Sequence, residues 1–110
     1  MPERYIQAQT TTASRADAEN IARVLVERRI AACVQVAGPI TSTYWWKGAI
    51  ETAEEWFCFA KTRADLYAEV EAAIKSVHPY EVPEIIATEI VAGSADYLRW
   101  IGESTKEQAS

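Results

Sequence analysis

The stretch from Thr41 to Lys61, TSTYWWKGAIETAEEWFCFAK, decides the fold of this chain and holds three of its four tryptophans. Residues 33–36 and 40–46 before the glycine, and 56–61 after it, are rich in β-branched and aromatic side chains, which favour strands. Lys47-Gly48-Ala49 supplies the turn between them. The pattern predicts an antiparallel hairpin that is longer than one small sheet needs. We therefore expect its far end to pair or pack with something else.

The length of 110 residues predicts one domain spanning the whole chain. Hydrophobic residues make up 49% and charged residues 25% of the sequence, as in an ordinary globular domain. The net charge of −5 argues against nucleic acid or an anionic membrane as the main partner. A cationic ligand suits this charge, although many domains without such a ligand are equally acidic.

The compartment and the redox state of the cysteines are predicted from the N-terminal residues, the apolar runs and the residues around each cysteine. The N-terminus shows no secretory leader, and no apolar run has membrane-spanning length, so we expect a cytoplasmic protein without a membrane partner. Cys33 and Cys58 each lie in an apolar strand and form no CxxC pair. Buried, reduced and poorly reactive thiols are favoured over a disulfide between them.

The segment before the hairpin predicts a strand followed by an amphipathic helix. Residues 5–10 alternate with a period of two, and residues 11–13 are expected to form a loop. Ser14 is a candidate N-cap with Asp17 three residues later, and apolar residues then recur at helical spacing to about Arg29. Within the hairpin, Gly38-Pro39 predicts a bulge, because proline cannot donate to the strand ladder.

The segment after the hairpin predicts helix, strand and helix. Thr62 is a candidate N-cap with Asp65 three residues later, and apolar residues from 66 to 77 follow at helical spacing until Pro79 ends the helix. A loop over 78–84, a strand over 85–91, and a helix capped by Ser94 with apolar residues over 97–101 come next. The polar residues 102–110 are predicted to fray.

The order of these elements predicts an α+β fold, the ferredoxin-like sandwich. Two strand–helix–strand halves are joined by the central hairpin into one antiparallel sheet with helices on one face, and a C-terminal helix is added. Right-handed crossovers fix the hand of each half.

Trp45 and Trp46 are adjacent on a strand, so their side chains point to opposite faces of the sheet. One ring can face the helices while the other lies on the open face. The second ring is either a single exposed tryptophan or part of a subunit interface, and the interface is the favoured interpretation.

His78, the only histidine, follows a helix and precedes a proline. It is a candidate metal ligand, but a capping or packed histidine is the simpler interpretation. Lys61 lies before a predicted helix and is a candidate anion contact or a solvated lysine. No nucleophile–base pair or phosphate loop is visible, so we do not expect an enzyme. The other candidate metal ligands have a thiol or carboxylate side chain that can bind a cation: Cys33, Cys58, Glu54, Glu81 and Glu84.

Several strings together resemble the CutA family of divalent-cation tolerance proteins. The most specific are YWWKG over 44–48 and HPYEVPE over 78–84, supported by LVE over 25–27, IAACV over 30–34, KTR over 61–63 and YLRWI over 97–101. The resemblance extends from Tyr5 to Ile101.

The resemblance implies a ferredoxin-like subunit in a homotrimer, in which the long hairpins continue the sheets of neighbouring subunits. It implies a role in tolerance of copper and other divalent metals, with no obligatory cofactor, and a similarity in architecture to the trimeric PII signalling proteins. The proposed metal site of the family matches Cys33 and His78, with Glu81 or Glu84 needed to complete weak Cu(II) binding at an intersubunit cleft. The expected interface residues are Tyr44, Trp45, Trp46 and Trp56.

Two other functions are alternatives to the metal response. One is a PII-like sensor that holds a small anionic ligand in a cleft with Lys61, Tyr80 and Trp46. The other is a trimeric module that assembles or anchors a partner protein.

Overall fold

A computed structural model describes residues 3–107 and confirms the α+β class. The elements, in chain order, are β1 (Tyr5–Thr12), α1 (Arg15–Glu27), β2 (Cys33–Trp46), β3 (Ala49–Arg63), the 3₁₀ helix η1 (Ala64–Leu66), α2 (Tyr67–Val77), β4 (Ile86–Glu89) and α3 (Ala95–Glu103).

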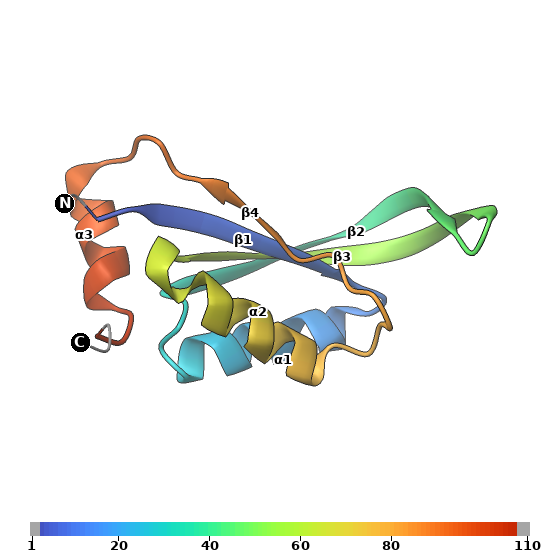
Figure 1. Ribbon diagram of the computed structural model, residues 1–110, viewed down its shortest axis with the longest axis horizontal. Helices are drawn as coiled ribbons and strands as arrows, with labels where there is room; N and C mark the ends of the chain where they lie inside the picture. The colour runs from blue at the N-terminus through green and yellow to red at the C-terminus, as the bar shows by residue number, and fades with distance from the viewer. Residues whose placement is uncertain (1–2, 108–110) are drawn as a thin grey trace.

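The four strands form one antiparallel sheet in the order β2-β3-β1-β4, which is the order of the ferredoxin-like sandwich. Helices α1 and α2 lie side by side across one face of this sheet, and α3 lies at one end of it (Figure 1). Among residues 3–107, no helix covers the opposite face. The sheet therefore has one closed face and one open face.

The core lies between the sheet and the two covering helices. Strand β1 alternates, with Ile6, Ala8 and Thr10 buried and the residues between them only half-buried. Helix α1 begins as predicted, since the Ser14 hydroxyl accepts a hydrogen bond from the backbone N–H of Asp17 at 3.1 Å. The residues of the two helices that complete the core are fully buried and apolar: Ala18, Ile21, Leu25, Val70, Ala73 and Ile74.

The central hairpin is as long as the sequence predicts, with strands of 14 and 15 residues. Its tip is a two-residue turn at Lys47-Gly48, where both φ angles are positive (50° and 81°), as in a type I′ turn. The strand register shifts between Ala37 and Ile40, which confirms the predicted bulge at Gly38-Pro39. Strand β1 ends opposite Trp56, so the outer half of the hairpin projects alone beyond the body of the subunit (Figure 1). We call residues 40–55 the arm.

The predicted N-cap at Thr62 is wrong. Thr62 is still part of β3, and its hydroxyl donates to the carbonyl of Ile30 at 2.6 Å instead of accepting from a helix N–H. Helix α2 begins at Tyr67 after the 3₁₀ turn and has no side-chain cap. Asp65 accepts hydrogen bonds from the Arg63 guanidinium, so the acid that resembled a capping partner serves an ion pair.

Two strand boundaries also differ from those expected. Strand β1 continues through Thr11 and Thr12, because both pair with β3, so the loop begins later than predicted. Strand β4 runs only over Ile86–Glu89, and all four of these residues pair with β1.

The fraying expected from Gly102 does not describe residues 102–107, and residues 108–110 lie outside the described part. Helix α3 continues to Glu103, and Thr105 is buried. The Arg63 guanidinium donates to the Thr105 hydroxyl at 2.9 Å and to the carbonyl of Lys106 at 2.6 Å. A buried guanidinium needs several acceptors, and the C-terminal segment supplies them. A polar composition therefore did not imply an undocked segment here.

Candidate functional site

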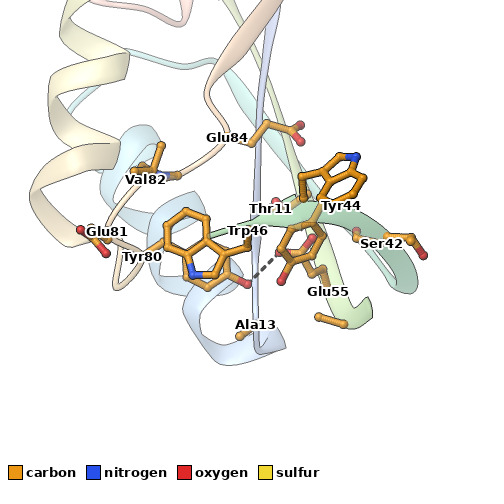
Figure 2. A pocket seen from close by; sticks show the side chains of 14 residues that line it. Thr11, Ala13, Ser42, Tyr44, Trp46, Glu55, Tyr80, Glu81, Val82 and Glu84 are labelled. Atoms are coloured by element: carbon orange, nitrogen blue, oxygen red, sulfur yellow. Dashed lines mark hydrogen bonds between the residues drawn. The ribbon is translucent and has the colours of Figure 1, made fainter. Parts of the chain in front are cut away.

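A large hollow of the subunit lies between the arm and the loop that follows α2. It has a volume of about 910 Å³. Side chains of the arm, including Tyr44, Trp46 and Glu55, line one side, and Tyr80 with the following loop residues through Glu84 line the other (Figure 2). We call this the arm pocket.

Glu55 and Tyr80 join the two sides of the arm pocket. The Tyr80 hydroxyl donates to the Glu55 carboxylate with an Oη–Oε2 distance of 2.7 Å, drawn as a dashed line in Figure 2. Glu55 is only 6% exposed. Burial, and then the bond to Glu55, raises the pKa of the Tyr80 phenol, so the phenol remains a donor at neutral pH. No ion pair to Glu55 is found among residues 3–107.

His78 fixes the start of the loop over residues 78–84 by hydrogen bonds to Thr11 and Tyr80. It is the C-cap residue of α2, and its ring is buried. Its Nε2 lies 2.7 Å from the carbonyl oxygen of Thr11, and its Nδ1 accepts from the backbone N–H of Tyr80 at 3.1 Å. A carbonyl only accepts, so the neutral tautomer with its proton on Nε2 satisfies both bonds. Neither ring nitrogen has a lone pair left for a metal within the subunit.

The four metal ligands expected from the sequence are not brought together in one subunit. Cys33 pairs with Lys61, which pairs with Gln7 of β1, whereas His78 contacts Thr11 four residues further along that strand. Four strand residues correspond to a separation of about 13 Å. Glu84 accepts a hydrogen bond from the side chain of Gln9 at 2.9 Å, and Glu81 is exposed.

Within the described residues, no group of three or more His, Cys, Asp or Glu side chains could hold a metal ion. The residues of a single subunit therefore do not fit a metal site of ordinary ligand number.

Two of the three residues expected in a ligand cleft line the same pocket. Trp46 and Tyr80 both line the arm pocket. Lys61 does not, and its ammonium contacts the amide oxygen of Gln35 at 2.5 Å on the sheet. Sequence reasoning missed Glu55, because, of the two adjacent acids on this strand, only Glu54 was considered, as a candidate metal ligand. The available signal was the position of Glu55 directly before Trp56, which lies opposite the bulge at Gly38-Pro39 in the partner strand.

The expected interface residues divide into two groups. Trp45 is 72% exposed and lies opposite Ile50, which is 63% exposed, on the arm. Tyr44 is also exposed and Trp46 is half-buried. Trp56, in contrast, packs against the core of its own subunit, and a Cβ at Gly38 would come within 2.8 Å of its ring. Of the expected interface residues, those on the arm therefore present uncovered apolar side chains, and Trp56 does not.

The two cysteines differ in environment, contrary to the expectation that both are buried. Cys58 is fully buried, and its thiol donates to the carbonyl of Ala18 at 3.2 Å, whereas Cys33 is half-buried. Both are free thiols, as expected. Burial raises the pKa of the Cys58 thiol from 9.0 to about 11.

We expect iodoacetamide to label Cys33 much faster than Cys58 in the folded protein near pH 8. The thiolate is the reactive form, and a pKa raised by about two units lowers the thiolate fraction about 100-fold, before the loss of access is counted. Mass spectrometry of timed samples measures both rates, and labelling in denaturant is the control. Equal rates in the folded state would contradict the burial of Cys58.

Most of the chain has clear relatives. Residues 6–104 match the model of the family described as CutA1 divalent ion tolerance protein. The divalent-cation tolerance protein CutA of Archaeoglobus fulgidus is 42% identical over 96 residues, which are 87% of this chain and 93% of that protein. The CutA homolog of Xenopus laevis is 46% identical over 90 residues, 82% of this chain and 60% of that protein. The chain thus spans little more than half of such longer relatives.

Solved structures agree with the fold. CutA1 from Oryza sativa superimposes with a TM-score of 0.92 at 33% identity and covers 96% of both chains. The structure from Archaeoglobus fulgidus gives 0.90 at 39% identity over 93% of this chain and 99% of that one, and that protein is described as periplasmic. Within residues 3–107, no helix is long and apolar enough to cross a membrane. The cytoplasmic location stays a prediction. The chain belongs to the CutA1 divalent ion tolerance protein family.

Proposed function

We propose that this protein acts in the response to divalent cations as a non-catalytic homotrimer, with its ligand pocket at the junction of subunits. The single observation that carries the proposal is the arm, which extends beyond the sheet and leaves Trp45 and Ile50 uncovered. Large neighbouring apolar side chains on a projecting hairpin mark an interface, because exposed apolar patches are unfavourable in water.

The open face of the sheet provides a second surface for assembly. Phe57 and Phe59 stack there with ring centroids 4.9 Å apart, and both remain half-buried in the single subunit. Strands β2 and β4 are the two edges of the sheet, and their unpaired backbone groups can extend it into a neighbour. These features support closed assembly of identical subunits rather than a free monomer.

A binding role is supported over a catalytic one by the state of His78. It is the only histidine, and hydrogen bonds occupy both of its ring nitrogens, so it is not poised as a general base. The large pocket beside it is lined by aromatic and carboxylate groups, which suit recognition of a ligand.

Divalent-cation binding is proposed to be weak and to need donors from two subunits. Within one subunit, Glu81 and Glu84 offer exposed carboxylates three positions apart on the same loop. Carboxylates alone make a sparse ligand set for Cu(II), the ion expected to bind most tightly among the common divalent ions.

The double substitution Glu81→Gln with Glu84→Gln is expected to weaken Cu(II) binding about tenfold, measured by calorimetry on tag-free protein. His78→Asn is expected to leave the affinity within about twofold, because the ring has no free donor atom. The matched control is Glu19→Gln with Glu27→Gln on the exposed face of α1. Loss of Cu(II) binding in a folded His78→Asn protein would restore His78 as a ligand and contradict this assignment.

The alternative of a small-ligand sensor is favoured by the size of the arm pocket. The anionic ligand expected near Lys61 is not what the lining favours, since Glu55, Glu81 and Glu84 line the pocket, and no lysine or arginine of residues 3–107 does. The anchoring alternative differs from both in requiring no ligand, and the Cu(II) titration separates it from the metal response. A thermal-shift screen of nucleotides and small acids tests the sensor.

A further inference from the structure

We infer that the arm pocket binds a small organic dication, a diammonium compound, with the Glu55 carboxylate as its main counter-charge. The inference deepens the proposed function, because it names the ligand class of the pocket that the proposed trimer places between subunits. It requires only that the pocket is open to solutes.

The first argument is the unpaired charge of Glu55. The residue is more than nine-tenths buried, at 6% exposure, and it lines the pocket. The Tyr80 hydroxyl bonds Oε2, and no cationic side chain of residues 3–107 is paired with the carboxylate. Nor is any fully buried carboxylate oxygen left without a partner in that range, so Oε1, for which no bond is found, keeps some solvent exposure. A buried carboxylate without a counter-ion is unfavourable, and a cation entering the pocket would relieve this.

The second argument is the aromatic wall. Tyr44, Trp46 and Tyr80 all line the pocket, together with Trp45. The faces of such rings attract ammonium groups. Trp46 already attracts one, since the Lys47 ammonium lies 5.6 Å from the ring centroid. Aromatic rings around a carboxylate form the kind of site that recognises organic cations.

The third argument concerns the size and the charge of the ligand. A volume of about 910 Å³ is far larger than a single metal ion needs, and it accommodates a small organic molecule. Glu55 lies on the arm side and Glu84 on the loop side (Figure 2). Carboxylates on both sides favour a ligand with an ammonium group at each end. The absence of lysine and arginine from the lining, within residues 3–107, leaves nothing to recognise an anion.

The test is calorimetric titration of the full chain with 1,4-diaminobutane at about 0.15 M salt, where surface charge effects are screened. Two ligands of the same chain length are controls, the neutral 1,4-butanediol and the anionic succinate. Only the diamine is expected to bind. Quenching of tryptophan fluorescence provides a second readout, because Trp45 and Trp46 line the pocket.

Glu55→Gln is expected to weaken diamine binding at least about tenfold, because it removes the charge and keeps the acceptor for Tyr80. Glu54→Gln makes the same change one residue away, outside the lining, and is expected to stay within about twofold of wild type. Trp46→Leu keeps an apolar side chain and is expected to weaken binding several-fold. It keeps the test decisive if Glu55→Gln does not fold.

Three results would overturn the inference. One is equal heat from the diamine and from 1,4-butanediol with wild-type protein. Another is diamine affinity that neither Glu55→Gln nor Trp46→Leu changes. The last combines two measurements: wild-type protein does not bind the diamine, and the Glu55→Gln protein has a different molar mass from wild type in light scattering. Glu55 would then be paired with a charge from a neighbouring subunit. The light-scattering mass of wild type reports separately on the trimer, so failure of this inference is distinguishable from failure of the proposed function.

Discussion

Arg63→Ala is expected to lower the free energy of unfolding by about 3 kcal/mol, in the range seen when one partner of a buried ion pair is removed. The Arg63 side chain is 7% exposed and joins three parts of the chain. Its guanidinium pairs with Glu3 at 3.0 Å and Asp65 at 2.9 Å, and it holds the C-terminal segment through Thr105. The substitution leaves these acceptors without their donor.

The pH dependence of this loss follows from Asp65. The hydrogen bond from Arg63 is the main cause that lowers the pKa of the Asp65 carboxyl below 3.8. The stabilisation is therefore fully present above about pH 3.8, and it is lost as the pH falls through the lower pKa of the folded state. We expect the difference between wild type and Arg63→Ala to narrow in strongly acidic solution.

Denaturant unfolding at one fixed protein concentration measures this loss, because assembly adds its own stabilisation. Arg99→Ala is the matched control, since Arg99 is exposed and, within residues 3–107, pairs only with Asp96 on the surface, and a change below about 0.5 kcal/mol is expected. Equal stability of wild type and Arg63→Ala would show that the C-terminal segment docks without the guanidinium.

Trp45→Lys combined with Ile50→Lys is expected to convert the assembly into monomers at micromolar concentration. Burying a large apolar side chain contributes about 1.5–3 kcal/mol. Loss of two such contacts per subunit, with a charge placed in each position, raises the dissociation constant by more than about 100-fold. Sedimentation velocity over a concentration series measures the change.

The control for the arm variant is Ala16→Lys, which adds a charge at an exposed position of α1 away from the arm. It is expected to keep the wild-type mass. Unchanged assembly in the double lysine variant, with native circular dichroism, would show that the arm is not the interface.

The fold was predictable because local patterns agreed with the tertiary arrangement. Lys47-Gly48 at the tip and Gly38-Pro39 at the bulge are dictated by backbone geometry, and Ser14 is a helix cap that needs no distant partner. The prediction failed at Thr62, because its hydroxyl donates a hydrogen bond to the distant carbonyl of Ile30 and does not cap the helix that follows. The docked C-terminal segment was missed because its partner, Arg63, lies 42 positions away from Thr105.

The site was less predictable than the fold. Trp46 and Tyr80 were placed in one cleft by the family resemblance, and both line the arm pocket. The role of Glu55 depends on a contact with Tyr80, 25 positions away, which no local pattern encodes. His78 resembled a metal ligand, because sequence cannot show that Thr11 and Tyr80 occupy its ring nitrogens.

The most direct test of the central claim is the molar mass of the tag-free protein by multi-angle light scattering at micromolar concentration. The subunit mass is 12.3 kDa, so the proposed trimer corresponds to three times 12.3 kDa, or about 37 kDa. We predict that mass across the whole elution peak, with no change on dilution through the micromolar range. A stable species of 12.3 kDa would contradict the account, because the arm would then remain exposed in solution.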